Sequence, residues 1–259
     1  MVEAQRGGVV VNGAAVQWIP YCGAAPLPAD WLARWNLDPL LLLTLAAAFL
    51  AWWRWRQPGR TDSRAAALSL GIVLVLFVSP FCALGSALFT ARVVHHVVLA
   101  TVLAGALVSA TGLHLRRLPQ SLAMLTAVQV LTFWAWHAPP LYGAALAHDG
   151  VFWAMQLTIT ATAALWWARL RQVSAAGAVT SLLATMMLMG VLGALITFAG
   201  RPLYAPHWLT TQAWDLSPLG DQQLAGILMW APASAIYLLA AMAILYRSLR
   251  GNAAEVLPA

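Results

Sequence analysis

Long apolar segments with almost no charge are the feature that most limits what this chain can fold into. Of its 259 residues, 62% are hydrophobic and only 8% are charged, and the mean hydropathy is +0.77. Soluble domains carry roughly 25% charged residues, so this composition indicates a membrane protein. A segment of about 20 apolar residues can cross a bilayer as an α-helix. We therefore predict an all-α, polytopic membrane protein.

Seven apolar segments predict seven transmembrane helices. Asp38 and Pro39 mark the start of the first, because Asp caps helix N-termini and Pro suits the first helical position. The expected spans are residues 40–53, 65–84, 93–113, 120–136, 151–168, 179–199 and 222–246.

The segments that flank the predicted transmembrane domain (residues 37–250) are short. Residues 1–36 predict a periplasmic arm, which lacks a signal-peptide pattern and should therefore stay uncleaved. Within it, Trp31 and Trp35 share one face and predict a short interfacial helix at the level of the lipid headgroups. Residues 251–259 predict a cytoplasmic tail.

The distribution of arginine predicts the orientation. Cytoplasmic connections of membrane proteins are enriched in basic residues, and seven crossings place ten arginines on one side and four on the other. We assign the richer side to the cytoplasm, so that the N-terminus lies outside and the C-terminus inside. The ten are Arg54, Arg56, Arg60, Arg64, Arg116, Arg117, Arg169, Arg171, Arg247 and Arg250, and the four are Arg6, Arg34, Arg92 and Arg201.

Chemically versatile side chains gather on the predicted outer side. Both cysteines and five of the six aspartates fall there, and His114 is the one histidine on the inner side. The outer histidines are His95, His96, His137, His148 and His207. This segregation indicates that the functional site lies at the periplasmic face.

The third span opens with an unusual group of ionisable residues, Arg92, His95 and His96. Such groups are costly within a membrane and usually face a bundle interior. Arg92 and His96 are four residues apart and share one helix face, whereas His95 lies about a quarter-turn away. His137 ends the fourth span near the same depth, so His96 and His137 are the main candidates for a shared metal or proton site.

Copper in its cuprous form suits the side chains on this face. Neutral imidazole and thioether groups are good copper ligands, and thiolates are better still for the cuprous ion. Asp221 is a harder ligand, and we expect it to orient a histidine N–H instead. The candidate ligands are His96, His137, His95, Cys22, Cys82 and Met229, and the candidate supporting residues are Asp221, Gln222, Arg92 and His148.

Structural interpretations stand beside these functional ones. Asp221 is equally suited to capping the seventh span, and Arg92 to contacting lipid headgroups or snorkelling towards them. His148 lies in a loop, where an interfacial anchor is the commoner role. Met189 has a setting typical of core filler. The two cysteines could pair with each other, bind a soft metal or do neither.

Other function classes are excluded or disfavoured. The chain has no lysine, so it cannot form the Schiff base of a retinal protein. Its net charge of +6 is interpreted as topology and contact with anionic lipid, not as nucleic-acid binding. No convincing pairing of a nucleophile with a base indicates an enzyme.

Short motifs along the chain carry a resemblance to a known family. The most specific is DQQLAGILMW at residues 221–230, and the others are WNLDP at 35–39, Ser79-Pro80, FTARVVHHVVL at 89–99, WHAPPLY at 136–142 and PLY at 202–204. Over roughly residues 35–247 the sequence resembles the CtaG-type cytochrome c oxidase assembly factors, a seven-span membrane family associated with the maturation of haem–copper oxidases.

At the third span the sequence differs from the family pattern. The family pattern there is similar to His-x-x-x-His, in which the second position matches His96 and the first falls on Arg92. His95 stands where glutamine is common. If that pair binds metal in relatives, this protein uses His95 instead or has one ligand fewer.

Together, the resemblance and the chemistry of the outer face imply an assembly factor for cytochrome c oxidase in a bacterial inner membrane, which catalyses no reaction and handles copper at the periplasmic side. Its expected partners are oxidase subunits and membrane lipid. One alternative is a membrane electron-transfer protein with a b-type haem between His96 and His137. Another is a metal-free scaffold that stabilises an oxidase subunit.

Overall fold

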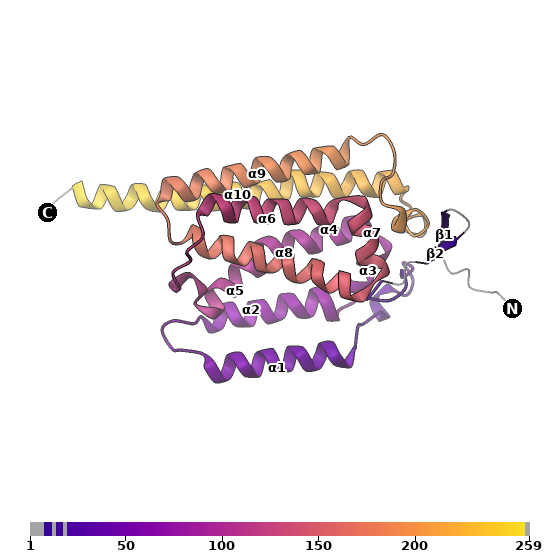
Figure 1. The fold of residues 1–259 in the computed structure, drawn as a ribbon, viewed down its shortest axis with the longest axis horizontal. Helices are drawn as coiled ribbons and strands as arrows, with labels where there is room; N and C mark the ends of the chain where they lie inside the picture. The colour runs from indigo at the N-terminus through magenta and orange to yellow at the C-terminus, as the bar shows by residue number, and fades with distance from the viewer. Residues whose placement is uncertain (1–7, 12–13, 18–19, 257–259) are drawn as a thin grey trace.

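Helices make up most of the chain in the computed structural model, which describes residues 8–11, 14–17 and 20–256. Figure 1 shows long helices lying side by side, with α3 and α7 at the end of the bundle that also carries β1 and β2. The all-helical character of the predicted domain is confirmed. Parts of the predicted arm and tail (residues 1–7, 12–13, 18–19 and 257–259) lie outside the described residues.

Most helices follow one another closely, and the longest connection, residues 198–217, joins α9 to α10. The α-helices are α1 (Pro39–Trp55), α2 (Ser63–Val73), α3 (Phe81–Ala87), α4 (Phe89–Val98), α5 (Ala104–Thr111), α6 (Leu122–His137), α7 (Pro139–Ala147), α8 (Asp149–Leu170), α9 (Ala175–Thr197) and α10 (Pro218–Val256). The π-helical turns are η2 (Leu74–Val78), which continues α2, and η3 (Leu99–Leu103), which joins α4 to α5. The 3₁₀ turns are η1 (Trp31–Ala33), η4 (Leu113–Leu115), η5 (Ala205–His207) and η6 (Gln212–Trp214).

Several of these helical runs are long and apolar enough to cross a membrane. Four qualify by themselves, and they are Phe89–Thr111, Asp149–Leu170, Ala175–Thr197 and Pro218–Arg250. A fifth candidate is the pair Ser63–Val78 and Phe81–Ala87, which is bent by 45°. The remaining two expected spans fall on α1 and α6, which are apolar but shorter. The chain therefore has the helices of a multi-pass membrane protein.

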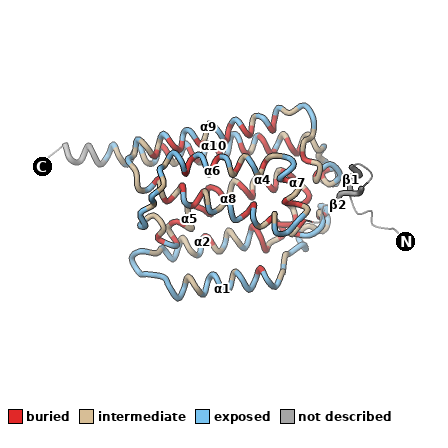
Figure 2. The backbone as a smooth tube through the Cα atoms, viewed as in Figure 1, coloured by how far each residue is buried: buried red, intermediate tan, exposed pale blue. Residues whose placement is uncertain are grey.

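The first long helix begins where the sequence predicts. Asp38 accepts hydrogen bonds from the backbone N–H groups of Leu40 (2.7 Å) and Leu41 (3.3 Å), and Pro39 occupies the first helical position. Leu41 is the one buried residue of α1, whose remaining surface is largely apolar and exposed (Figure 2). An exposed apolar surface of this kind suits contact with lipid.

The N-terminal region differs from its prediction. Trp31 lies in η1, which is a single 3₁₀ turn of three residues and not the short interfacial helix that we expected. Ahead of it, β1 (Gly8–Val11) and β2 (Ala14–Gln17) pair as an antiparallel hairpin, which the all-α prediction missed. The signal was present in the sequence, because Asn-Gly between two valine-rich segments is a strong hairpin signal.

Glycine allows α9 and α10 to approach closely. A Cβ atom at Gly193 would lie 2.8 Å from the carbonyl oxygen of Gly226 and 2.9 Å from the backbone nitrogen of Trp230. Small residues at such contacts let helix backbones pack in a membrane without a hydrophobic driving force. This contact holds α9 against α10, which carries Asp221 and Met229.

We expect Gly193→Ala to lower the free energy of unfolding by about 1–3 kcal/mol, because the added methyl group overpacks a backbone contact. Gly71→Ala is the matched control, since a Cβ atom there meets nothing within 4 Å. Thermal unfolding of both variants in detergent measures the difference. Equal midpoints would contradict the proposed tight α9–α10 contact.

Candidate metal-binding site

Two buried histidines from different helices meet near the end of the bundle that carries α7 and η5. His96 belongs to α4, and His137 is the last residue of α6. Nδ1 of His96 lies 3.4 Å from Nε2 of His137, and the two rings are nearly perpendicular, at 89°. Their exposed fractions are 0% and 2%. The structure thus brings the two main sequence candidates together, and metal binding by them stays a prediction.

A backbone carbonyl fixes the tautomer of His137. Its Nδ1 lies 2.7 Å from the carbonyl oxygen of Phe133, one turn earlier in α6. A carbonyl can only accept, so Nδ1 carries the proton and Nε2 of the neutral ring keeps its lone pair. The Phe133 ring also stacks on the imidazole, with centroids 4.4 Å apart. The lone pair of His137 is therefore held towards His96.

The geometry of this pair suits two ligands on one metal ion. Two imidazole nitrogens bound about 2.0–2.1 Å from a tetrahedral metal stand about 3.3 Å apart, close to the 3.4 Å between His96 and His137. His96 fits this role in the tautomer that carries its proton on Nε2. That nitrogen has no protein hydrogen-bond partner among the described residues. Without a metal, the other tautomer lets His96 donate a hydrogen bond to His137.

His95 does not join this pair. Its ring lies edge-on to Phe77, with centroids 4.8 Å apart, and near Phe81 at 6.3 Å. The centroid of His96 is 5.9 Å away. Neither ring nitrogen of His95 has a protein partner in the described part of the chain. The structure therefore places His95 on the α3 side of α4 and His96 on the α6 side.

Cys22 and Cys82 form a disulfide bond with each other. Of the alternatives that the sequence left open, the structure shows pairing. An oxidised pair offers no thiolate, so neither residue serves as a copper ligand in this state. The bond fastens the segment before α1 to α3, across a sequence separation of 60 residues.

Asp221 has a different role from both that the sequence suggested. It lies inside the first turn of α10, so it is not the N-cap of that helix. Its carboxylate accepts hydrogen bonds from the backbone N–H groups of Phe89 (2.7 Å) and Thr90 (3.1 Å), and not from a histidine. The hydroxyl of Thr90 donates to the Asp221 carbonyl oxygen in return. Asp221 thus caps α4, the helix that carries His96.

Gln222 and His148 also lie apart from the histidine pair. Gln222 accepts a hydrogen bond from the N–H of Leu203 and donates to the carbonyl oxygens of Ile196 and Arg201. It therefore supports the connection between α9 and α10. His148 is exposed between α7 and α8, beside an open surface hollow of about 520 Å³.

Arg92 is buried completely, so it neither snorkels nor contacts headgroups. Its guanidinium carbon lies 5.2 Å from the centroid of the Phe152 ring, in a cation–π contact. Gly85 makes room for it, because a Cβ atom there would lie 2.8 Å from that carbon. Within the described chain, no protein group forms a hydrogen bond with the guanidinium nitrogens. Arg92 is a fixed positive charge one helical turn from His96.

Two tyrosines, Tyr142 and Tyr204, help to position the site. Neither is a candidate from the sequence, where both appear only within the family motifs. The hydroxyl of Tyr204 donates to the carbonyl oxygen of His137 (2.8 Å), and that of Tyr142 donates to Nε2 of His207 (2.7 Å). Burial raises the pKa of both tyrosines above the usual range, so the hydroxyls stay protonated. The Phe89 ring stacks on Tyr204 at 3.7 Å. These aromatic residues adjoin the histidine pair.

Met229 is fully buried and lines a small cavity beside Phe133. No three side chains of His, Cys, Asp or Glu converge as a metal site within the described residues. A metal held by His96 and His137 would therefore take any further ligand from a different kind of group, such as a thioether.

Comparison with known proteins identifies the chain at the level of its family. Residues 46–251 match the family described as cytochrome c oxidase caa3 assembly factor (Caa3_CtaG). No curated protein and no solved structure gives a match.

We expect Asp221→Ala to lower the free energy of unfolding by about 1–3 kcal/mol, since it leaves buried backbone donors of α4 unpaired. Hydrogen exchange should quicken at the amides of Phe89 and Thr90 before it does elsewhere in α4. Asp149→Ala, at the exposed first turn of α8, is the control. Unchanged exchange at the start of α4 would contradict the capping role.

His207 predicts a dependence of stability on pH. Burial lowers its pKa to about 3, and the charge of Arg92 adds to this effect. The unfolded chain, in which the pKa is about 6.5, therefore binds a proton that the folded chain does not. The contribution of His207 to stability is complete above pH 7 and falls as the pH drops from about 6.5 towards 3.

The test compares thermal unfolding of the wild type and His207→Gln at pH 7.5 and pH 5. Gln can still accept from Tyr142 but does not titrate. We expect the wild type to lose more stability than the variant between these two conditions. Parallel losses in the two proteins would contradict the assignment.

Proposed function

We propose a copper-handling role for this chain, which belongs to the cytochrome c oxidase caa3 assembly factor family. In this role it binds Cu(I) at the periplasmic side of a bacterial inner membrane and passes it to an oxidase subunit. The chain acts as a carrier and catalyses no reaction.

The observation that carries this proposal is the geometry of His96 and His137. Their facing nitrogens are 3.4 Å apart, and the Phe133 carbonyl holds the His137 lone pair towards the gap. Both ligands are neutral, and the fixed charge of Arg92 makes a doubly charged ion less favourable than a singly charged one. Imidazole nitrogen in an apolar setting therefore supports Cu(I), and Met229 is available as a soft ligand nearby.

We further propose that the chain crosses the membrane seven times. Besides the four long runs and the bent pair, α1 and α6 are shorter apolar helices of 17 and 16 residues, and the apolar segments of the sequence assign one further crossing to each. The arginine distribution then places the N-terminus in the periplasm. The Cys22–Cys82 disulfide supports this orientation, because both residues lie on the proposed outer side and disulfides persist in the oxidising periplasm.

The same geometry does not favour the b-type haem. A haem iron would need His96 and His137 on opposite faces of a porphyrin. Their rings instead approach directly, with centroids 5.1 Å apart. We expect the optical spectrum of the reduced protein to show no haem bands. Haem bands would favour the electron-transfer protein instead.

The test is the copper content of reduced, detergent-purified protein offered Cu(I). We expect the wild type to bind copper and His96→Ala/His137→Ala to lose the copper held by these nitrogens. His114→Ala/His148→Ala is the matched control, since both of its histidines lie away from the pair, and it should bind as the wild type does. X-ray absorption at the copper edge of the wild type should show imidazole scattering.

The opposite results would be decisive. Copper content that is the same in the wild type and in His96→Ala/His137→Ala would refute the assignment of the site. Absence of copper from every protein would refute copper handling and favour a scaffold for an oxidase subunit.

A further inference from the structure

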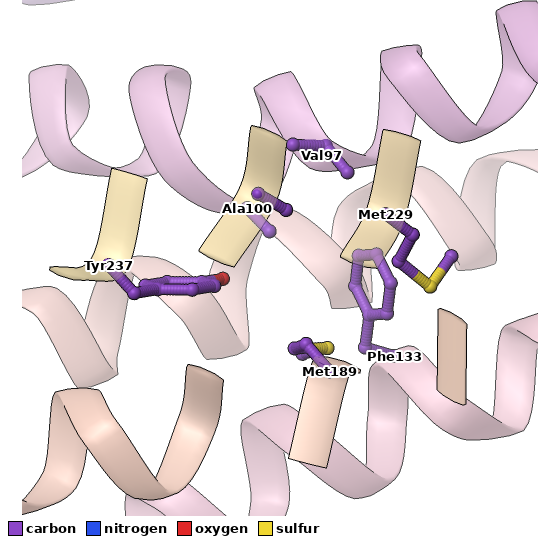
Figure 3. A pocket seen from close by; sticks show the side chains of 7 residues that line it. Val97, Ala100, Phe133, Met189, Met229 and Tyr237 are labelled. Carbon is purple, nitrogen blue, oxygen red and sulfur yellow. The ribbon is translucent and has the colours of Figure 1, made fainter. Parts of the chain in front are cut away.

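A small cavity lies inside the bundle, next to the histidine pair. Its volume is about 10 Å³, which is about the space that one water molecule or one ion requires. Figure 3 shows its lining, which comes from α4, η3, α6, α9 and α10. The lining residues are Val97, Ala100, Phe133, Met189, Met229, Ala233 and Tyr237.

Sequence spacing and contacts place this cavity one helical turn from the histidines. Val97 follows His96 directly, and Ala100 lies one turn further along the same helical run. Phe133 lines the cavity and also stacks on His137. The ring of Phe133 therefore adjoins both the histidine pair and the cavity.

Beside the cavity, the helical run that begins with α4 and the helix α10 both depart from regular α-helical hydrogen bonding. The π-helical turn η3 includes Ala100, and π-helical turns are frequent at functional sites. Pro232 lies inside α10 between the lining residues Met229 and Ala233. Proline lacks the N–H that would bond to the preceding turn. Two independent irregularities at one small cavity indicate a position that the fold keeps open.

The chemistry of the lining suits a soft cation better than a water molecule. A buried water needs two to four polar partners, and the hydroxyl of Tyr237 is the one side-chain oxygen in the lining. Met189 and Met229 are buried and bring thioether sulfur from two helices (Figure 3). Thioethers select Cu(I), and the face of Phe133 can contribute a cation–π contact.

A layer of uncharged polar groups follows one turn deeper. Gln129 precedes Phe133 by four residues, and Thr185 precedes Met189 by four. Both are buried, and their side-chain polar atoms have no hydrogen-bond partner within the described chain. Unpaired dipoles of this kind are costly in an apolar interior, and a cation in the cavity, which Phe133 and Met189 line, would lie about one helical turn from them.

We infer that this cavity is a second Cu(I) site, with Met189 and Met229 as thioether ligands beneath the His96–His137 site. The inference rests on the proposed copper-handling function and extends it, because it gives the chain two adjoining positions for its cargo. Copper can then exchange between nitrogen and sulfur ligands without leaving the bundle.

The test counts Cu(I) per chain by competition with a chromogenic Cu(I) chelator. We expect two ions in the wild type, one in Met189→Leu/Met229→Leu and one in His96→Ala/His137→Ala. Leucine preserves the apolar volume. Met187→Leu/Met242→Leu is the matched control, because it changes one exposed methionine on each of the same two helices, and it should keep two ions.

A second measurement does not depend on changing the methionines. In selenomethionine-labelled His96→Ala/His137→Ala, the copper-edge X-ray absorption should show selenium neighbours. Suppose that the wild type binds one ion that the histidine variant loses and Met189→Leu/Met229→Leu keeps. This result overturns the second site and leaves the proposed function intact. One ion lost in either variant means a single mixed site and also overturns the inference. No ion in any protein overturns both proposals.

Discussion

The hydrogen bonds from the start of α4 to Asp221 are the interaction on which the candidate site depends. A carboxylate from the first turn of α10 accepts the N–H groups of Phe89 and Thr90, which are 132 and 131 residues away in sequence. A helix N-terminus carries partial positive charge. The N-terminus of α4 therefore stabilises the buried carboxylate of Asp221, and the carboxylate stabilises the helix in return. Because α4 is rigid, this cap also sets the depth of Arg92, His95 and His96. Gly193 and Gly226 then fix α10 against α9.

Inside this frame, the donors that could meet a metal are neutral. His96 and His137 supply nitrogen, and the cavity one turn away supplies the sulfur of Met189 and Met229. The nearest fixed charge on the same helix is the cation Arg92, held between Gly85 and the Phe152 ring. Low dielectric strengthens every electrostatic effect in such a place. A metal site of this composition would discriminate by the charge and softness of the ion more than by a rigid ligand count.

The sequence predicted those features that depend on contacts between residues close together in the chain. The apolar segments predicted the positions of the long helices, and the Asp38-Pro39 pair predicted the start of α1, because caps act within one turn. The cost of ionisable groups in an apolar bundle likewise predicted that His96 and His137 face inward. The role of Asp221 could not be predicted in this way, since its partners come from another helix. The same holds for the π-helical turn η3 and for the cavity, which depend on how four helices pack.

The disulfide between Cys22 and Cys82 closes a covalent ring that contains α1 and α2. Within this ring, α1 buries Leu41 alone, so packing contributes little to keeping it in place. The ring changes how the chain carries a mechanical load. A force applied to the two ends passes from Cys22 directly to Cys82, and the 60-residue separation between them, about 200 Å of extended chain, bears no tension. The helix α1, which packing holds least, is thereby shielded together with α2 from being pulled out of the membrane.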